Sequence, residues 1–344
     1  MSKPITVVQS LASAERGGAE SFYTRLVCEL VNYPEIEQHA FTRPWPDRVA
    51  QLLEAGLPVQ TFKFGGPLAW RDRQKYRQAL KDLKPDIVLT YMSRATFSTP
   101  PGDYKLAARL GHYYNLKYYR HCDYWIGISK GICKHLIDGG MPADRVFHIP
   151  NFVNETVAEP LPRASYDTPA GVPLLFACGR LHTNKAFDIL LEALVDVPDA
   201  VLWLAGEGPE QKALEAQCRK LKLQDRVRFL GWRNDINSLM RTADIFVCPS
   251  RHEGLGSIVG ESWFNECPIV AADSQGPGEL IDNEVTGLVT PIDEPKPMAD
   301  AINRLLGDAA LSKSLAERAK RHYHEFYSQD IIVKRYVDFF KQIA

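Results

Sequence analysis

Two acidic residues on either side of a glycine-rich turn, Glu253 and Glu261, have a placement typical of a ligand site. The apolar run 245–248 before them predicts a strand, and the run 257–264 after the turn predicts a helix. Such a turn aims the free N–H groups and the positive dipole end of the helix at a ligand, which favours a phosphate. Carboxylates beside it can accept hydrogen bonds from hydroxyl groups, so the pattern predicts a phosphorylated sugar. An isolated pair of this kind is more typical of a helix-end charge and a solvated helix face.

Two cations, Arg180 and Lys185, lie in a second turn, between a predicted strand at 174–178 and a predicted helix at 186–196. Together they would suit a diphosphate, because guanidinium and ammonium groups bind phosphate oxygens. Ligands of open α/β sheets bind outside the carboxyl ends of the strands. We therefore expect both cations at the same sheet edge as the two carboxylates, although each cation alone is more typical of a solvated surface.

The segment Gly254–Gly260 also has an alternative interpretation. A glycine turn between a strand and a helix is typical of nicotinamide-binding Rossmann units, in which Glu279 or Asp282 would bind the ribose. The glycines here read GxGxxxG, one residue longer than the usual fingerprint, and they lie in the second half of the chain. A NAD-dependent oxidoreductase that uses this turn is the alternative from another enzyme class.

The composition is that of an ordinary globular protein. The chain has 344 residues, of which 45% are hydrophobic and 24% charged, with a formal net charge of −1, and it is long enough for two cores. Seven cysteines without a CxxC or His/Cys cluster indicate reduced thiols rather than a disulfide framework or a zinc site. The N-terminal sequence lacks the apolar core of a signal peptide, so we expect a cytoplasmic protein.

Strands and helices alternate in two series, which predicts an α/β fold with parallel sheets covered by helices on both faces. Proline-rich residues 151–173 separate the series. We expect two Rossmann-like, doubly wound domains, over residues 1–158 and 159–328, with a cleft between them. A final helix at about 329–344 is expected to pack back on the first domain. The predicted strands are 5–8, 39–42, 59–62, 86–90, 105–110, 125–128 and 146–149 in the first series, and 174–178, 201–205, 227–230, 245–248, 269–271 and 288–290 in the second.

Charge is distributed unevenly between the two halves. Up to Pro150 there are 20 Lys and Arg against 14 Asp and Glu, an excess of six positive charges, whereas the remainder has an excess of seven negative charges. In the stretch Arg109–Trp125, three cations alternate with six aromatic residues, which suits an anionic inner-membrane surface or a lipid-linked glycan. A core filled by these aromatic side chains, with the cations solvated, explains the stretch equally well.

His112 follows the predicted strand 105–110 and could point toward a bound ligand. A lone histidine is more often a packed or surface residue, and position alone does not separate these interpretations.

Four segments of the second domain carry a more specific signal. Together they resemble the C-terminal domain of the retaining family-four glycosyltransferases, which have the two-domain GT-B architecture. Gly17-Gly18-Ala19-Glu20 and Ile149-Pro150-Asn151 match in place in the first domain. The four segments are GRLHTNKAFDILLEAL, FLGW, ADIFVCPSRHEGLGSIVGES and GPGELIDNEVTGLV.

The resemblance assigns roles to individual residues. It implies that Arg180 and Lys185 clamp a diphosphate, that Glu253 contacts the donor sugar and that Glu261 contacts the ribose. His112 corresponds to the active-site histidine of the family by its place after a strand. The donor-binding set implied in this way is Gly17, Gly18, Arg180, Lys185, Glu253, Gly254, Leu255, Gly256, Ser257 and Glu261. The departures are a short first domain, Phe152 where the family has Gly, and Ala186 after the lysine.

The resemblance implies transfer of a sugar from a UDP- or GDP-type nucleotide sugar to an acceptor hydroxyl with retention at the anomeric carbon. The expected acceptor is a glycan or a lipid-linked glycan of the cell envelope, such as lipopolysaccharide, capsule or exopolysaccharide, and it would bind the first domain. No cofactor and no nucleic-acid partner are expected, and the absence of an Asp-x-Asp motif agrees with metal independence. A GT-B epimerase or phosphorylase and a non-catalytic sugar-nucleotide sensor remain alternatives.

Overall fold

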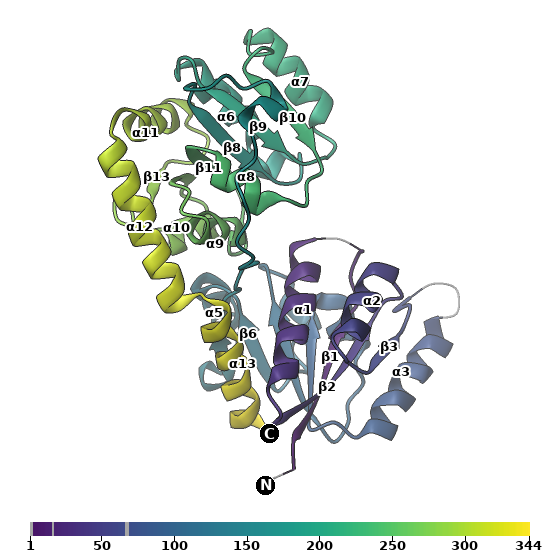
Figure 1. Ribbon diagram of the computed structural model, residues 1–344. Coiled ribbons are helices and arrows are strands. Elements are labelled where there is room, and N and C mark those ends of the chain that lie inside the picture. The colour runs from purple at the N-terminus through teal and green to yellow at the C-terminus, as the bar shows by residue number, and fades with distance from the viewer. Residues whose placement is uncertain (1–2, 16, 66–68) are drawn as a thin grey trace. The chain divides into compact units, whose positions relative to one another are not determined.

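The computed structural model describes residues 3–15, 17–65 and 69–344. It divides into two compact units: residues up to Phe152 together with Gln329–Ala344, and residues Val153–Ser328 (Figure 1). The first unit ends at Phe152 rather than at residue 158, because the Phe152 side chain is buried in its core. The amide of Val153, by contrast, donates a hydrogen bond to the Tyr323 hydroxyl of the second unit (3.2 Å).

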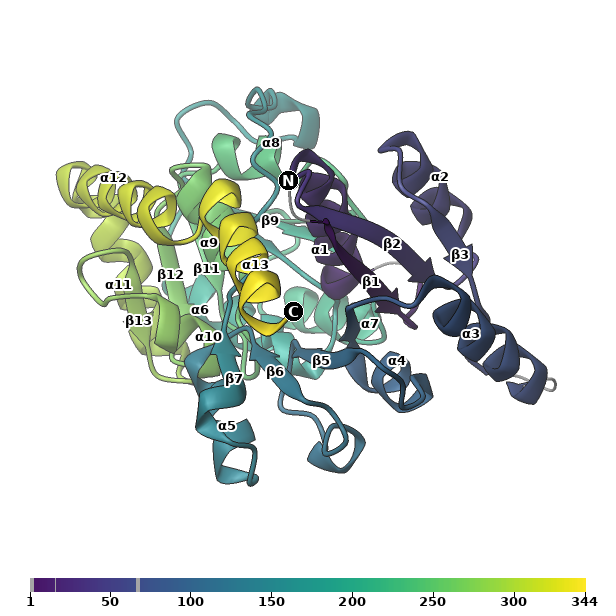
Figure 2. The same cartoon turned by 90° about the horizontal axis from the view of Figure 1, so that it is seen from below.

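The first unit contains a parallel sheet of seven strands in the order β3-β2-β1-β4-β5-β6-β7. Helices α1, α2 and α13 lie on one face of this sheet and α3, α4 and α5 on the other (Figure 2). The strands are β1 (Ile5–Leu11), β2 (Ile36–Thr42), β3 (Val59–Thr61), β4 (Ile87–Tyr91), β5 (Lys105–Leu110), β6 (Tyr124–Gly127) and β7 (Val146–His148). The helices are α1 (Gly18–Glu29), α2 (Pro46–Glu54), α3 (Ala69–Leu83), α4 (Met92–Ser98), α5 (Lys130–Asp138) and α13 (Gln329–Ile343).

Helix α13 belongs to the core of the first unit although it lies at the other end of the sequence. Its apolar side chains pack with those of β1, β4 and α1. The buried Arg109 of β5 fixes it further, because its Nε donates to the Tyr336 hydroxyl (3.0 Å) and its guanidinium lies over the Phe22 ring, 4.3 Å from the centroid. A second nitrogen of Arg109 donates to the Asn151 side chain, so one cation joins β5, α13 and the end of the N-terminal stretch.

The basic and aromatic stretch Arg109–Trp125 does not form one continuous surface. Arg109, Tyr119 and Trp125 are buried, and the Trp125 indole donates to the backbone oxygen of Tyr119 (2.9 Å). Lys117 remains exposed and Tyr118 is half-buried. The core interpretation of this stretch therefore holds for Tyr119 and Trp125, whereas Arg109 is buried and not solvated as that interpretation assumed.

The second unit contains a parallel sheet of six strands in the order β10-β9-β8-β11-β12-β13. Apolar side chains of α6, α7 and α11 form a core with this sheet, and α12 packs against α9 (Figure 1). The strands are β8 (Leu174–Cys178), β9 (Val201–Ala205), β10 (Val227–Gly231), β11 (Ile245–Cys248), β12 (Ile269–Ala272) and β13 (Leu288–Thr290). The helices are α6 (Phe187–Val195), α7 (Gln211–Lys220), α8 (Ile236–Thr242), α9 (Ser257–Phe264), α10 (Gln275–Leu280), α11 (Pro295–Gly307) and α12 (Ala309–Phe326).

Within residues 3–15, 17–65 and 69–344, no helix combines the length and the apolar character needed to cross a membrane.

Candidate functional site

The carboxyl ends of β8 and β11 bring two predicted site residues together in the second unit. These strands are neighbours and parallel, so the loops that follow them leave the same edge of the sheet. Lys185 from the first loop forms an ion pair with the Oε1 atom of Glu253 from the second loop. Both side chains are largely buried, and the Ser250 hydroxyl donates to the same carboxylate oxygen (2.9 Å).

Burial and pairing act on the Lys185 ammonium in opposite directions. Burial lowers the pKa of Lys185, but the Glu253 carboxylate, together with the nearby Cys248 and Cys178, offsets this effect, so the pKa lies above its ordinary value. Lys185 is therefore cationic at neutral pH. Gly179 makes room for its aliphatic chain: a Cβ at Gly179 would lie 3.0 Å from the Lys185 Cε, and its φ of +150° is unfavourable for other residues.

Three predicted site groups, Glu261, Lys185 and Glu253, act electrostatically on the thiol of Cys178, the last residue of β8. Burial raises the pKa of Cys178, the Glu261 and Glu253 carboxylates raise it further, and Lys185 lowers it. Glu261 lies one turn inside α9, so the helix places its carboxylate near the same strand end. Three of the four charged residues that were predicted at one edge thus act on the terminus of one strand.

The turn 254–256 and helix α9 supply backbone groups to this edge. Gly254, Leu255 and Gly256 are buried, and Gly256 precedes the helix with a φ of +72°, a left-handed conformation that glycine adopts without strain. The close approach of Gly276 to the backbone of Leu255 fixes the turn against α10. Ser257 begins α9, so the dipole of this helix points toward the loop that carries Glu253.

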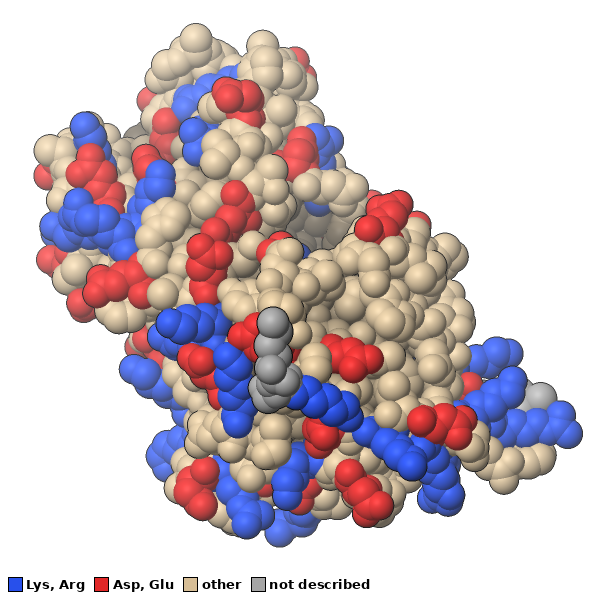
Figure 3. Space-filling model, turned by 60° about the horizontal axis from the view of Figure 1, so that its bottom comes forward, with Lys and Arg blue, Asp and Glu red and all other residues tan. Residues whose placement is uncertain are grey.

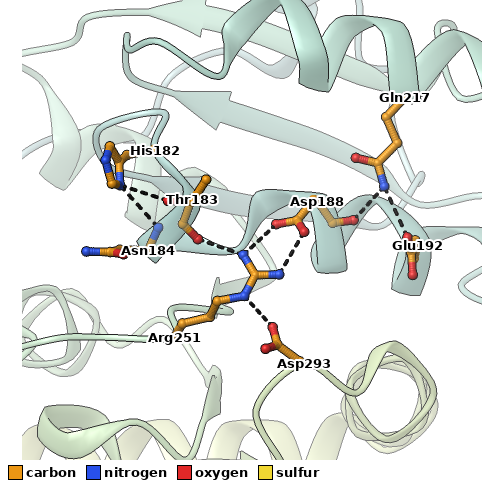
Figure 4. Close-up of polar contacts among 8 residues, drawn as sticks. All are labelled: His182, Thr183, Asn184, Asp188, Glu192, Gln217, Arg251 and Asp293. Atoms are coloured by element: carbon orange, nitrogen blue, oxygen red, sulfur yellow. Dashed lines mark hydrogen bonds and ion pairs between the residues drawn. The ribbon is translucent and has the colours of Figure 1, made fainter.

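Arg251, which the sequence patterns did not single out, joins the two site loops (Figure 4). It donates to both carboxylate oxygens of Asp188 (3.0 and 2.7 Å), to the backbone oxygen of Thr183 (2.6 Å) and to Asp293 (2.5 Å). Its own amide donates to the backbone oxygen of Asn184 (2.8 Å). Because Thr183 and Asn184 directly precede Lys185, these bonds hold the loop of Lys185 against the loop of Glu253.

Arg180 is placed differently from Lys185. Its side chain is exposed, and within the described part of the chain it makes no hydrogen bond or ion pair. Its loop is nevertheless fixed, since the amide of the next residue, Leu181, donates to the backbone oxygen of Glu207 (2.9 Å). A fixed loop with a free guanidinium is available to an anionic ligand.

The remaining predicted site residues belong to the first unit. Gly17 and Gly18 stand between β1 and α1, and His112 follows β5, so all three lie beyond carboxyl ends of that sheet. His112 is exposed, and its Nδ1 accepts a hydrogen bond from the Tyr113 amide (2.8 Å). In the neutral ring the proton is then on Nε2, which is left as an outward donor.

A metal site is a separate question. Among the residues that the structure describes, no three His, Cys, Asp or Glu side chains form a group that could hold a metal ion.

Comparison with known proteins identifies the family. Residues 161–322 match the family model described as "Glycosyl transferases group 1". The lipopolysaccharide core biosynthesis glycosyltransferase LpsE of Rhizobium meliloti (strain 1021) is 31% identical over 335 residues, covering 93% of this chain and 95% of LpsE. LpsD of the same strain is 31% identical over 331 residues, covering 94% of this chain and 95% of LpsD.

A solved structure shows the fold. Anabaena HepE in complex with UDP and glucose has a TM-score of 0.86 to this chain at 21% identity, covering 98% of this chain and 100% of HepE. Two parallel-sheet α/β units that share this similarity are the GT-B architecture. On the family match and the two relatives, the chain belongs to the group 1 glycosyltransferases.

Proposed function

We propose that this glycosyltransferase moves a sugar from a UDP- or GDP-type nucleotide sugar to an acceptor hydroxyl, with retention at the anomeric carbon, in the assembly of a cell-envelope glycan. The observation that carries the proposal is the Lys185–Glu253 pair beside Glu261 and the N-terminus of α9. LpsE and LpsD, which are named for lipopolysaccharide core biosynthesis, support the glycan class. The UDP and glucose in HepE support the donor class, and the family match disfavours a nicotinamide enzyme at the Gly254 turn.

The site would stabilise the departing diphosphate. As the bond to the sugar breaks, negative charge grows on the β-phosphate, and Arg180, Lys185 and the backbone N–H groups at 254–257 would interact with it more strongly. The Glu253 carboxylate lies next to Lys185, at the place where an anion would bind. When the diphosphate takes that place, Glu253 is free to accept hydrogen bonds from the sugar hydroxyls.

Retention follows if the acceptor hydroxyl enters on the face from which the diphosphate leaves. The hydroxyl proton then passes to a phosphate oxygen as the new bond to the anomeric carbon forms. This route needs no carboxylate nucleophile, and it leaves Glu253 a binding role. Glu261 would contact the ribose, whose interactions are the same before and during bond cleavage.

Alanine substitution of Arg180 or Lys185 should therefore lower kcat more than it weakens donor binding. Loss of one such donor commonly costs about 2.7–4 kcal/mol of transition-state stabilisation, or roughly two to three decades in rate. Arg180→Lys should restore only part of it, because an ammonium lacks the planar two-pronged contact. Glu261→Ala should mainly raise the donor KM. Steady-state kinetics measure these effects, with the exposed Arg219→Ala of α7 as control; losses in donor binding alone would contradict the clamp.

Arg251 is a positioning residue in this scheme, since its bonds fix the two loops and not the donor. Arg251→Gln should lower kcat/KM by roughly ten- to a hundredfold, because small displacements of positioned groups are costly. Arg251→Lys should recover little of it, since an ammonium cannot bridge both oxygens of Asp188. Asp293→Asn removes an exposed partner only and serves as the matched control. Donor affinity and thermal midpoint are measured together; a lower midpoint with unchanged kinetics would reduce Arg251 to a structural role.

For His112, we expect a function on the acceptor side that depends on its Nε2–H group. His112→Ala should lower turnover by well over tenfold with little change in donor affinity. His112→Asn is the sharper variant, because its side-chain oxygen can replace Nδ1 as the acceptor of the Tyr113 amide. It should be as impaired as the alanine variant. Turnover close to that of the unaltered protein in both variants would return His112 to the status of an ordinary surface residue.

The first unit also offers a surface suited to an anionic membrane. The exposed Trp70 and Phe97 are 57% and 58% accessible, and Arg73 of α3 lies over the Phe97 ring (5.9 Å). The Phe97 ring contacts the Tyr118 ring (5.9 Å between centroids). The Lys117 ammonium lies over the Tyr118 ring, 4.8 Å from its centroid. Figure 3 shows further Lys and Arg side chains gathered over the region of α3, at the right. Cations with exposed interfacial aromatic rings are the composition that binds acidic lipids.

Vesicle cosedimentation tests this surface. The protein should bind phosphatidylglycerol vesicles in a salt-sensitive way, because interactions between exposed charges are screened. Removal of one cation, as in Arg73→Gln, should cost about 1 kcal/mol of binding. Trp70→Ala and Phe97→Ala should weaken binding, whereas Trp232→Ala, which alters a 51% accessible ring of the second unit, should not. Equal effects of all three substitutions would argue against a specific membrane surface.

A further inference from the structure

A pocket in the first unit, distinct from the residues assigned so far, lies beyond the carboxyl ends of β2, β3 and β4. Its volume is about 530 Å³. Arg43 and Trp45 come from the loop after β2, Lys63 and Phe64 from the loop after β3, and Arg94 from α4, which follows β4 directly. The carboxyl edge is where open α/β sheets bind ligands. The pocket is therefore placed where a substrate would be expected.

The pocket is cationic and not neutralised. Arg43, Lys63 and Arg94 line it together with no acidic residue of the described chain. Across residues 3–15, 17–65 and 69–344, none of these three head groups forms an ion pair with a carboxylate. The sequence positions outside those ranges are not acidic either. Three like charges around one cavity repel one another, and an anion placed between them removes that repulsion.

Contacts within the first unit hold two parts of the pocket lining in place. The Trp45 indole donates to the backbone oxygen of Ser13 (3.1 Å), and the Arg43 guanidinium lies 5.5 Å from the centroid of its ring. On the opposite wall, both oxygens of Asp72 accept backbone N–H groups, from Lys63 (2.9 Å) and Phe64 (2.7 Å). Asp72 thus fixes the loop through its backbone. The result is a fixed aromatic face beside a set of cations.

We infer that this pocket binds an anionic group, a phosphate or a carboxylate, carried by the acceptor saccharide, whose ring packs on Trp45. Guanidinium groups match the oxygens of both anions, and a half-buried aromatic ring suits the apolar face of a sugar. The inference rests on the proposed function, because it takes the first unit to be the acceptor side. It adds the chemical class of the acceptor, an acidic or phosphorylated glycan.

The sheet order also indicates where the anionic group lies on the acceptor. In the sheet, β1 and β4 separate β2 from β5, so at about 4.8 Å per strand the ends of β2 and β5 are roughly 14 Å apart. His112 follows β5, whereas Trp45, the ring on which the sugar would pack, follows β2. An acceptor that reached both would be an oligosaccharide with its anionic group on a sugar other than the one that reacts.

Phosphorus NMR titration of the full chain with maltose 1-phosphate tests the inference, with unphosphorylated maltose as competitor. The sugar phosphate should bind, and Lys63→Gln and Arg94→Gln should each weaken it roughly tenfold, the scale of one charged hydrogen bond. Arg145→Gln, an exposed arginine of the same unit, is the matched control and should change nothing. Lys185→Ala should leave this binding intact, which excludes capture at the donor site. Inorganic phosphate should bind at least about tenfold more weakly, since it has no ring to pack on Trp45.

Other results would overturn the inference. Equal affinity in the unaltered protein and the Lys63→Gln/Arg94→Gln double variant would remove the pocket from saccharide binding. Equal binding of inorganic phosphate would make it an ion site without sugar recognition. If the double variant lost only binding to phosphatidylglycerol vesicles, the anion would be a lipid headgroup. A parallel titration with UDP-glucose and GDP-mannose separates the two hypotheses: absent donor binding would contradict the proposed function, whereas normal donor binding with no sugar-phosphate binding would contradict only this inference.

Discussion

Because every strand in each sheet runs parallel to its neighbours, each unit has a single edge at which all its strands end, and every group implicated in function lies at one of these two edges. At the edge of the second unit this convergence places an ammonium and a carboxylate from distant loops in contact. Burial there removes water from the Lys185 ammonium, and the Glu253 carboxylate replaces the water as its partner. A buried charge without such a partner would cost several kcal/mol. The Lys185–Glu253 ion pair joins the two loops, and a bound diphosphate would have to replace Glu253 in this pair.

The two members of the ion pair come from separate loops, so their contact depends on a frame that holds these loops together. Arg251 provides this frame with five hydrogen bonds that never touch the pair itself, counting its amide. The glycine turn before α9 is fixed separately, by its packing on α10. Because these contacts fix the loops independently of the ion pair, the Lys185 and Glu253 side chains can change partners while their backbones stay in place. An ion pair between two site residues is therefore compatible with ligand binding at the same place.

Much of the fold could be predicted because its signals are local. The helix predicted at 257–264 is α9 with the same bounds, and the strand series follows apolar runs bounded by turns. Short helices such as α4 and α8, of seven residues each, are too short to repeat a helical apolar period and were not predicted. The residues predicted for the site lie in turns, or in the helices that follow them, at the expected sheet edges. Their catalytic roles remain predictions.

What the sequence could not show depends on contacts between distant positions. Arg251 meets Asp188 across 63 positions and Asp293 across 42, so no spacing pattern contains it. The buried Arg109 donates a hydrogen bond to Tyr336, which lies 227 positions away in the sequence. The composition of its segment predicted that Arg109 is a surface cation, whereas in the fold it lies between the aromatic rings of Phe22 and Tyr91. The cationic pocket likewise takes Arg43 and Lys63 from two loops and Arg94 from helix α4.

The placement of α13 has a consequence for synthesis on the ribosome. The first unit takes residues from both ends of the chain, whereas Val153–Ser328 are continuous. At about 5–20 residues per second, the N-terminal stretch waits roughly 10 to 35 s for the helix that completes its core. During that interval the apolar surface under α13, including Phe22 and Phe152, has no cover, and Arg109 lacks Tyr336. The second unit can bury its own core in the meantime, so the two cores are completed in the reverse of their order along the chain.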